Sequence, residues 1–227
     1  MTAMWAVVPA KDGREAKQRL AAVLTPAERR QLFLAMLGDV LTALAACDAL
    51  AGIAVVTRDA GARALALAFG ARILVETACR GHDAAVTLAA RTLAGEGCDG
   101  LISLPADVPL ATPAEIAKVL DAHGGAPAIT AVPAHDGRGT NALACSPPDA
   151  IAFRYGGDSF ARHLAAARAR GIEPAVVRLP GLALDIDIPC DLAAFLRAPS
   201  ATRSFAYLEE SGVAERCFSA AAIRAVG

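Results

Sequence analysis

Short apolar runs alternate along the chain with longer stretches in which apolar residues recur at helical spacing. The apolar runs predict strands at 4–9, 53–57, 72–76, 101–105, 128–132, 141–145, 175–179 and 182–186. The stretches between them predict helices near 26–46, 60–69, 83–95, 113–122, 159–170 and 190–197. This alternation predicts a single α/β domain with a mostly parallel, mixed sheet and helices on both faces.

Local signals refine this pattern. The tetrapeptide "TPAE" occurs at 25–28 and at 112–115, and each copy predicts a helix that begins with a capping box and a first-turn proline. Gly171 follows the run "RARAR" and is expected to close a helix in the left-handed conformation. The close spacing of the segments within 128–145 predicts a local antiparallel insertion. Because the pattern loosens after Pro199, we expect a domain over 1–199 and an appended helical tail over 200–227.

The composition excludes several classes of protein. With 55% hydrophobic and 20% charged residues among 227, the chain can bury a sizeable core. A net charge of -1 provides no basic field for nucleic acid, and no apolar run is long enough to span a membrane. The first residues lack the pattern of a signal peptide, and the six cysteines are scattered without zinc-site spacing. We therefore expect a cytoplasmic protein.

Three aspartates follow apolar segments where strands should end. Asp185 and Asp187 lie in "LALDIDIP" and would point to the same side of an extended chain, where their charges repel. Asp107 follows the run "LISLP". Because ligands of open α/β sheets collect at the carboxyl ends of strands, the three could share an Mg²⁺ or Mn²⁺ ion. The alternative is structural: Asp187 caps the helix beginning at Pro189, and Asp185 pairs with an arginine.

Three loops could bind anions. The segment 9–20 carries Lys11, Arg14, Lys17 and Arg19, which could bind phosphates. The alternative, a solvated and salt-bridged turn, is about equally plausible. No Walker or G-x-G-x-x-G motif occurs. The loops "DGRGTNALA" (136–144) and "RYGGDSFARH" (154–163) are rich in glycine and hydroxyl residues, and Asp158 or Ser159 could equally be an ordinary N-cap. His163 and three arginines add positive charge nearby, and we expect His82, His123 and His135 to be surface residues.

Five segments occur together in the order of one family: "VPAKDGREAKQRLAAVLTPAERRQLFLAMLGDVL", "LPADVPL", "DGRGTNAL", "GGDSFARHLAAARARGI" and "LDIDIPCDL". Over residues 4–197 the chain resembles the 2-phospho-L-lactate guanylyltransferase family, whose members have a glycosyltransferase-A-like nucleotidyltransferase fold. That family makes the phosphoacid–guanosine intermediate of deazaflavin coenzyme F(420). The motifs "GTNAL" and "SFARH" are the specific part of the resemblance, because the aspartate motifs occur across the broader superfamily. This chain departs from the family pattern in reading "YGGDSF" at 155–160 and "GHDA" at 81–84.

The resemblance implies a metal-dependent transfer of GMP from GTP to a small phosphoacid, with release of pyrophosphate. The acceptor is 2-phospho-L-lactate, phosphoenolpyruvate or 3-phospho-D-glycerate, and we expect a homodimer. The three aspartates would bind the metal, Lys17 would contact the triphosphate, and Arg19 would assist it. Thr140, Gly156 and Ser159 would hold the acceptor, with Lys11 and Asn141 as further substrate contacts, and Asp83 could select guanine. The alternatives are a molybdenum-cofactor or sugar nucleotidyltransferase of the same fold, or a nucleotide-binding module without catalysis.

Overall fold

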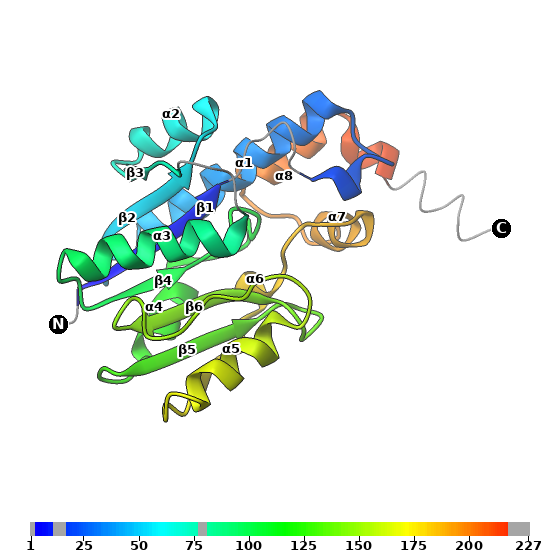
Figure 1. Ribbon diagram of the computed structural model, residues 1–227. Coiled ribbons are helices and arrows are strands. Elements are labelled where there is room, and N and C mark those ends of the chain that lie inside the picture. Colours follow the sequence, from blue (N-terminus) through cyan, green and yellow to red (C-terminus); the bar gives the residue numbers. More distant parts are fainter. Residues whose placement is uncertain (1–2, 11–16, 77–80, 218–227) are drawn as a thin grey trace.

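A computed structural model describes residues 3–10, 17–76 and 81–217 (Figure 1). Its strands form one sheet in the order β3-β2-β1-β4-β6-β5-β7. Among these strands, only β6 runs antiparallel to its neighbours, which confirms the predicted mixed sheet with an antiparallel insertion. The strands are β1 (Met4–Ala10), β2 (Leu50–Thr57), β3 (Arg72–Leu74), β4 (Gly100–Ser103), β5 (Ala128–Pro133), β6 (Thr140–Ser146) and β7 (Ala175–Val176).

Helices cover both faces of the sheet, as predicted (Figure 1). Along β1, Ala6 and Val8 face one apolar cluster and Val7 faces the other, because successive side chains of a strand point to opposite sides. The first cluster includes α1 (Pro26–Ala45), α2 (Ala60–Ala68), α4 (Pro113–Asp121) and α6 (Pro180–Ala183), and the second includes α3 (His82–Gly95) and α5 (Ser159–Arg168). A third cluster joins α1 to η1 (Gln18–Leu20), α7 (Pro189–Leu196) and α8 (Arg203–Glu210).

The two "TPAE" segments start helices differently. At α1 the capping box is complete, because Thr25 Oγ1 accepts from Glu28 N and the Glu28 carboxylate accepts from Thr25 N. At α4 the Thr112 hydroxyl caps the helix, but Glu115 does not reach back. The Glu115 carboxylate instead accepts from the backbone N–H groups of Gly181 at 2.9 Å and Leu182 at 3.0 Å. The prediction of a second capping box is therefore wrong, and Glu115 fixes the start of α6.

The predicted strand at 182–186 is also wrong. Residues 180–183 form α6, because Pro180 suits a first helical turn and Glu115 satisfies its free N–H groups. An irregular segment follows, in which Ile186 is fully buried between Asp185 and Asp187. The backbone N–H of Ile186 donates to the carbonyl of Asp107 at 3.0 Å. The two aspartates are thus brought beside Asp107 without belonging to the sheet.

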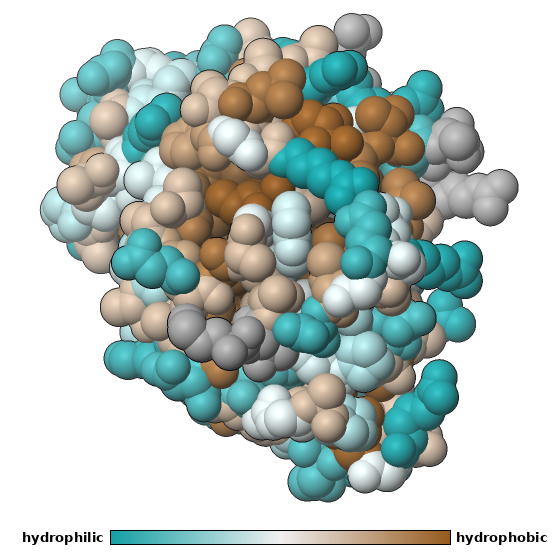
Figure 2. All heavy atoms as spheres, turned by 90° about the vertical axis from the view of Figure 1, so that its left-hand side faces the viewer, coloured by the Kyte–Doolittle hydropathy of each residue, from teal (hydrophilic) through white to brown (hydrophobic). Residues whose placement is uncertain are grey.

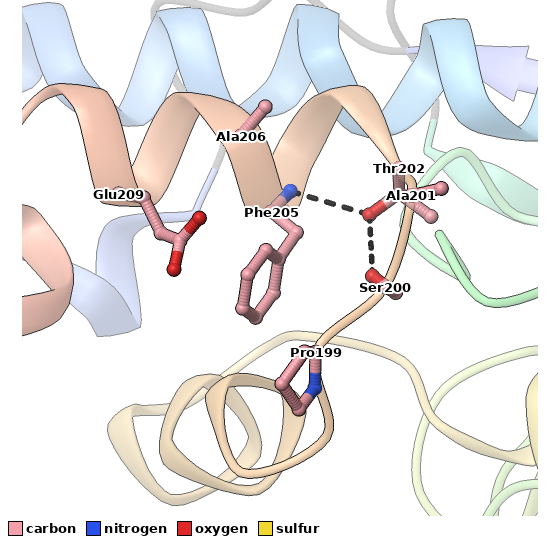
Figure 3. A pocket seen from close by; sticks show the side chains of 7 residues that line it. All are labelled: Pro199, Ser200, Ala201, Thr202, Phe205, Ala206 and Glu209. Atoms are coloured by element: carbon pink, nitrogen blue, oxygen red, sulfur yellow. Dashed lines mark hydrogen bonds between the residues drawn. The ribbon is translucent and has the colours of Figure 1, made fainter.

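The segment after Pro199 forms α8, which lies along α1 (Figure 1). Phe205, Leu208 and Val213 are buried in the third cluster. Thr202 is the N-cap of α8, and its hydroxyl oxygen accepts from Phe205 N at 3.2 Å (Figure 3). An open pocket lies beside this cap, and none of the predicted site residues lines it (Figure 3). The division of the chain at residue 199 stays a prediction, and 218–227 lie outside the described residues.

Asp39, a buried residue of α1, binds the start of α8. Its carboxylate accepts from Arg203 N at 2.7 Å, Ser204 N at 3.0 Å and Ser204 Oγ at 2.6 Å. Replacing Asp39 with alanine should lower the free energy of unfolding by about 1–3 kcal/mol, because these donors lose their acceptor. Urea denaturation measures this loss, and a change below about 0.5 kcal/mol, the size of an ordinary surface substitution, would show that α8 does not depend on Asp39.

Hydrophobic residues also reach the surface on the side that carries α2 and β3. Leu67 and Val75 are each more than half exposed there, and Figure 2 shows hydrophobic residues gathered between hydrophilic ones on that side. No helix within the described ranges is long and apolar enough to cross a membrane. The expected homodimer stays a prediction.

Candidate active site

Three aspartates and one lysine meet at the carboxyl end of β4. We call Asp107, Asp185 and Asp187 the acidic rim. Lys17 Nζ donates to Asp107 Oδ2 and to Asp187 Oδ1, the latter at 2.7 Å. Lys17 is thereby joined to residues 90 and 170 positions away in the chain. The sequence predicted that the carboxylates lie together, but not that Lys17 lies between two of them.

Lys17 is the cation that the described structure places between these carboxylates. Its side chain is only 6% exposed. Burial by itself lowers the pKa of Lys17, but the charges of Asp107 and Asp187 outweigh it and raise that pKa above its ordinary value. The backbone of Lys17 is left-handed, with φ of 58°, which is unfavourable for a residue with a Cβ atom. These ion pairs hold the strained turn in place.

Within the part of the chain that the structure describes, neither structural alternative for the aspartates holds. Asp187 does not cap α7, because Asp191 Oδ2 accepts from the N–H groups of Asp187 at 3.0 Å and Ile188 at 2.9 Å. Asp185 accepts from Asn141 Nδ2 at 3.0 Å and has no arginine partner among the described residues. The same amide donates to Ala183 O at 2.9 Å, so Asn141 orients Asp185, and a direct contact of Asn141 with substrate stays a prediction.

The acidic rim has the donor chemistry of a divalent-metal site. Asp107 Oδ1 is buried and has no hydrogen-bond partner among the described residues. Burial raises the pKa of Asp185, and the neighbouring charges of Asp107 and Asp187 raise it further despite the hydrogen bond from Asn141. Both observations fit a site that requires more positive charge. In the arrangement described, Lys17 Nζ lies between two of the carboxylates. Within the described ranges, no group of three or more His, Cys, Asp or Glu side chains has the geometry of a metal site.

A second polar cluster lies at the start of β6. Because β6 is antiparallel to β4, it begins near the edge where β4 ends, which brings Thr140 and Asn141 close to the acidic rim. Thr140 Oγ1 is 3.0 Å from His163 Nδ1 and accepts from Ser159 Oγ at 3.2 Å. Gly156, in the loop before α5, has a φ of 86° and is exposed. Thr140 and Ser159 are therefore in contact, and Gly156 precedes Ser159 by three residues in the chain. That the three hold the acceptor, as the resemblance implies, stays a prediction.

His163 does not add positive charge, contrary to the sequence-based expectation. The side chain is fully buried. Burial lowers the pKa of His163 to about 4; Asp83 opposes this effect, whereas Arg162 and His82 reinforce it. The ring is therefore neutral at pH 7.

This neutral state predicts a pH dependence of stability. The unfolded chain takes up a proton on His163 below about pH 6.5, whereas the folded protein does not until about pH 4. Stability is therefore complete above this window and is lost as the pH falls through it. Between pH 7 and pH 5 the wild type should lose about 2 kcal/mol more than the His163→Asn variant, measured by urea denaturation. Parallel losses in the two proteins would contradict a neutral His163.

Asp83 lies at the first turn of α3 and binds the loop before α5. Its Oδ1 accepts from Tyr155 N at 2.7 Å, and the ring of Tyr155 lies against those of His82 and His163. Asp158, a departure from the family pattern, accepts from Arg138 Nε at 2.8 Å. This partner lowers the pKa of Asp158 and balances its negative charge.

The remaining predictions concern the basic residues of segment 9–20 and the histidines. Arg19 is exposed and has no hydrogen bond or ion pair with a described residue, while Lys11 and Arg14 lie outside the described residues. His123 is wrongly predicted as a surface residue without partners, because its ring contacts Thr130 and Ser146 at 3.0 Å. His135 is exposed as expected, yet its ring lies 3.8 Å from Asp185 and 3.5 Å from Asp191. The sequence marked Glu115 only as a capping-box residue and gave no signal for Asp191, because the partners of these buried acids come from distant or irregular segments.

The family model described as "Guanylyl transferase CofC like" matches residues 4–225. The chain belongs to the CofC-like guanylyltransferase family. The chain is 40% identical over 190 residues to a phosphoenolpyruvate guanylyltransferase of Rubrobacter xylanophilus, covering 84% of this chain and 92% of that protein. A 3-phospho-D-glycerate guanylyltransferase of Colwellia psychrerythraea is 36% identical over 186 residues, with 82% and 88% coverage.

The fold is shared with a protein of Desulfovibrio desulfuricans named as a nucleotide-diphospho-sugar transferase, with a TM-score of 0.75, 17% identity and coverage of 96% and 99%. The predicted fold and family are therefore confirmed, and the chain is a guanylyltransferase-type enzyme. Membership of the family argues against both alternatives, the same-fold nucleotidyltransferase with another substrate and the nucleotide-binding module without catalysis. Nucleotidyltransferases of this kind generally use a divalent metal.

Proposed function

We propose that this protein transfers GMP from GTP to the phosphate of a small phosphorylated carboxylic acid in a Mg²⁺-dependent reaction. The observation that carries this proposal is the acidic rim with Lys17, lying beside the hydroxyl groups of Thr140 and Ser159. The rim provides oxygen donors for a metal that neutralises phosphate charge. The Thr140 hydroxyl, which accepts from Ser159, provides a neutral donor for a second anion.

In the proposed reaction, a phosphate oxygen of the acceptor attacks the α-phosphorus of GTP. The new bond joins this oxygen to the α-phosphorus, the bond from the α-phosphorus to the bridging oxygen breaks, and pyrophosphate leaves. The acceptor phosphate is already ionised at pH 7, so no strong general base is required. Alignment and charge stabilisation provide the rate enhancement.

Each part of the site has a role in this reaction. Asp107, Asp185 and Asp187 would hold the divalent cation, which supplies charge neutralisation of the phosphates when bound. Lys17 carries its positive charge at pH 7 and binds the triphosphate. Asn141 holds Asp185 toward the rim. The Thr140 hydroxyl and the backbone N–H groups near Gly156 and Ser159 would hold the acceptor. A cytoplasmic location and a homodimer remain expectations.

The acceptor is tested by pyrophosphate release from GTP and Mg²⁺ with phosphoenolpyruvate, 2-phospho-L-lactate or 3-phospho-D-glycerate. The names of the Rubrobacter and Colwellia relatives favour phosphoenolpyruvate or 3-phospho-D-glycerate. We expect release with one acid in clear preference to the others. Release only with other acceptors, such as sugar phosphates, would leave the fold intact but overturn the proposed substrate.

We further propose that Asp83 selects guanine through its second carboxylate oxygen, since Oδ1 is engaged by Tyr155 N. The Asp83→Asn variant can keep the Tyr155 contact through its amide oxygen while presenting an N–H group to the donors of guanine. It should lose about 10-fold of the preference for GTP over ATP, the cost of unpaired donors. The ratio of kcat/KM for the two nucleotides measures this change. Unchanged preference for GTP over ATP in Asp83→Asn would contradict this proposal. If Asp83→Ala also kept that preference but had a lower free energy of unfolding, the role of Asp83 would be limited to its contact with Tyr155.

A further inference from the structure

His163 is a fully buried histidine whose two ring nitrogens both have partners. Nδ1 lies 3.0 Å from Thr140 Oγ1, and Nε2 lies 3.0 Å from the backbone nitrogen of Arg154. The ring of Tyr155 packs edge-on against it, with the centroids 4.9 Å apart. The ring is thus fixed at three points, which come from β6, from the loop before α5 and from an aromatic neighbour.

These contacts determine where the proton of the ring is. A backbone N–H can only donate, so Nε2 must accept from Arg154 and carries no proton. The neutral ring then has its proton on Nδ1, and this N–H donates to Thr140 Oγ1.

The hydrogen bonds of the Thr140 hydroxyl are fixed by its two neighbours in the same way. A hydroxyl oxygen has two lone pairs and one proton. One lone pair accepts from His163 Nδ1–H and the other from Ser159 Oγ–H. With both lone pairs engaged, Thr140 can act toward a ligand only as a hydrogen-bond donor, which is the role that an anion requires.

We propose that His163 is a positioning residue that commits the Thr140 hydroxyl to donate to the anionic acceptor. This inference rests on the proposed function, in which Thr140 contacts the acceptor. His163 itself does not touch substrate, and it acts through one hydroxyl group. The neutral ring supplies this control without adding a charge that would attract any anion.

Two variants separate the two ends of the ring. In His163→Asn the side-chain N–H can replace Nδ1–H and still donate to Thr140, but the contact with Arg154 N is lost. In His163→Gln the side-chain oxygen can replace Nε2 and keep the contact with Arg154 N, but the donor to Thr140 is lost. We expect His163→Gln to raise KM for the phosphoacid about 10-fold, the size of a lost hydrogen bond to a charged group, and to leave KM for GTP unchanged. In His163→Asn, KM for the phosphoacid should stay within about 3-fold of the wild-type value.

The double variant His163→Gln with Thr140→Val tests the connection between the residues. If His163 acts through Thr140, the double variant should be no worse than Thr140→Val alone. Additive losses, or equal rises in KM for both substrates in both His163 variants, would show a purely structural role and overturn the proposal.

A measurement on the wild-type protein keeps the proposal testable if His163→Gln does not fold. The ¹⁵N NMR shifts of the His163 ring at pH 7 should show a proton on Nδ1 and none on Nε2. The opposite tautomer or a charged ring would overturn the proposal. Failure of the proposed function is distinguishable, because the wild type would then release no pyrophosphate with any of the three acids while the ring keeps its tautomer.

Discussion

Replacing Asp107 with asparagine should lower kcat for GTP-dependent transfer by roughly 10³-fold, the scale of losing a major electrostatic contact in a transition state. The carboxylate binds Lys17 through Oδ2, and its Oδ1 is buried without a partner among the described residues. Asparagine keeps the shape but removes the charge that a metal ion requires. Acceptor-dependent pyrophosphate release measures the rate.

The fold should tolerate this change far better than the reaction does. A melting temperature close to that of the wild type would show that the lost rate is not lost protein. Asp121→Asn, at the exposed end of α4, is a matched control that removes one negative charge elsewhere and should keep the full rate. If Asp107→Asn retained a near wild-type rate, the assignment of the acidic rim to catalysis would be wrong.

Replacing Lys17 with methionine should lower kcat/KM for GTP by about 10²-fold to 10³-fold, because a positive charge on the triphosphate is lost. In the absence of metal, the same change should lower the free energy of unfolding by about 2 kcal/mol. This loss is smaller than that expected on breaking a fully buried ion pair, because the side chain of Asp187 is 47% exposed. Lys17 is the cation that offsets the repulsion between Asp107 and Asp187 in the described structure.

A divalent cation should restore part of that stability in Lys17→Met, because it can neutralise the same carboxylates. Thermal unfolding with and without Mg²⁺ measures this rescue. Lys118→Met on α4 serves as the control and should show neither the loss nor the rescue. Equal Mg²⁺ effects on all three proteins would argue that the cation does not bind at the acidic rim.

The sequence predicted the sheet well because its strands are short apolar runs between well-marked helix starts. It failed at 182–186, where Pro180 and the distant carboxylate of Glu115 favour a helix over a strand. The clustering of the acidic rim was predictable, since each aspartate follows an apolar segment near one edge. That Lys17 lies between two of the carboxylates was not predictable, because the contact joins residues 90 and 170 positions apart.

The role of His163 shows the same limit of sequence reasoning. A histidine beside arginines suggests positive charge, yet complete burial makes it neutral. Burial and the direction of its hydrogen bonds depend on the packing of α5 against β6, which no local pattern reveals. The family motif "SFARH" marked the position without indicating its chemistry.

The decisive measurement is pyrophosphate release from GTP with and without Mg²⁺, and with and without whichever of the three phosphoacids the protein prefers. We expect release only when nucleotide, acceptor and divalent cation are all present, and we expect chelation of the metal to abolish it. Release that persists without the cation, or that proceeds at the same rate without any phosphoacid, would contradict metal-dependent guanylyl transfer at the acidic rim.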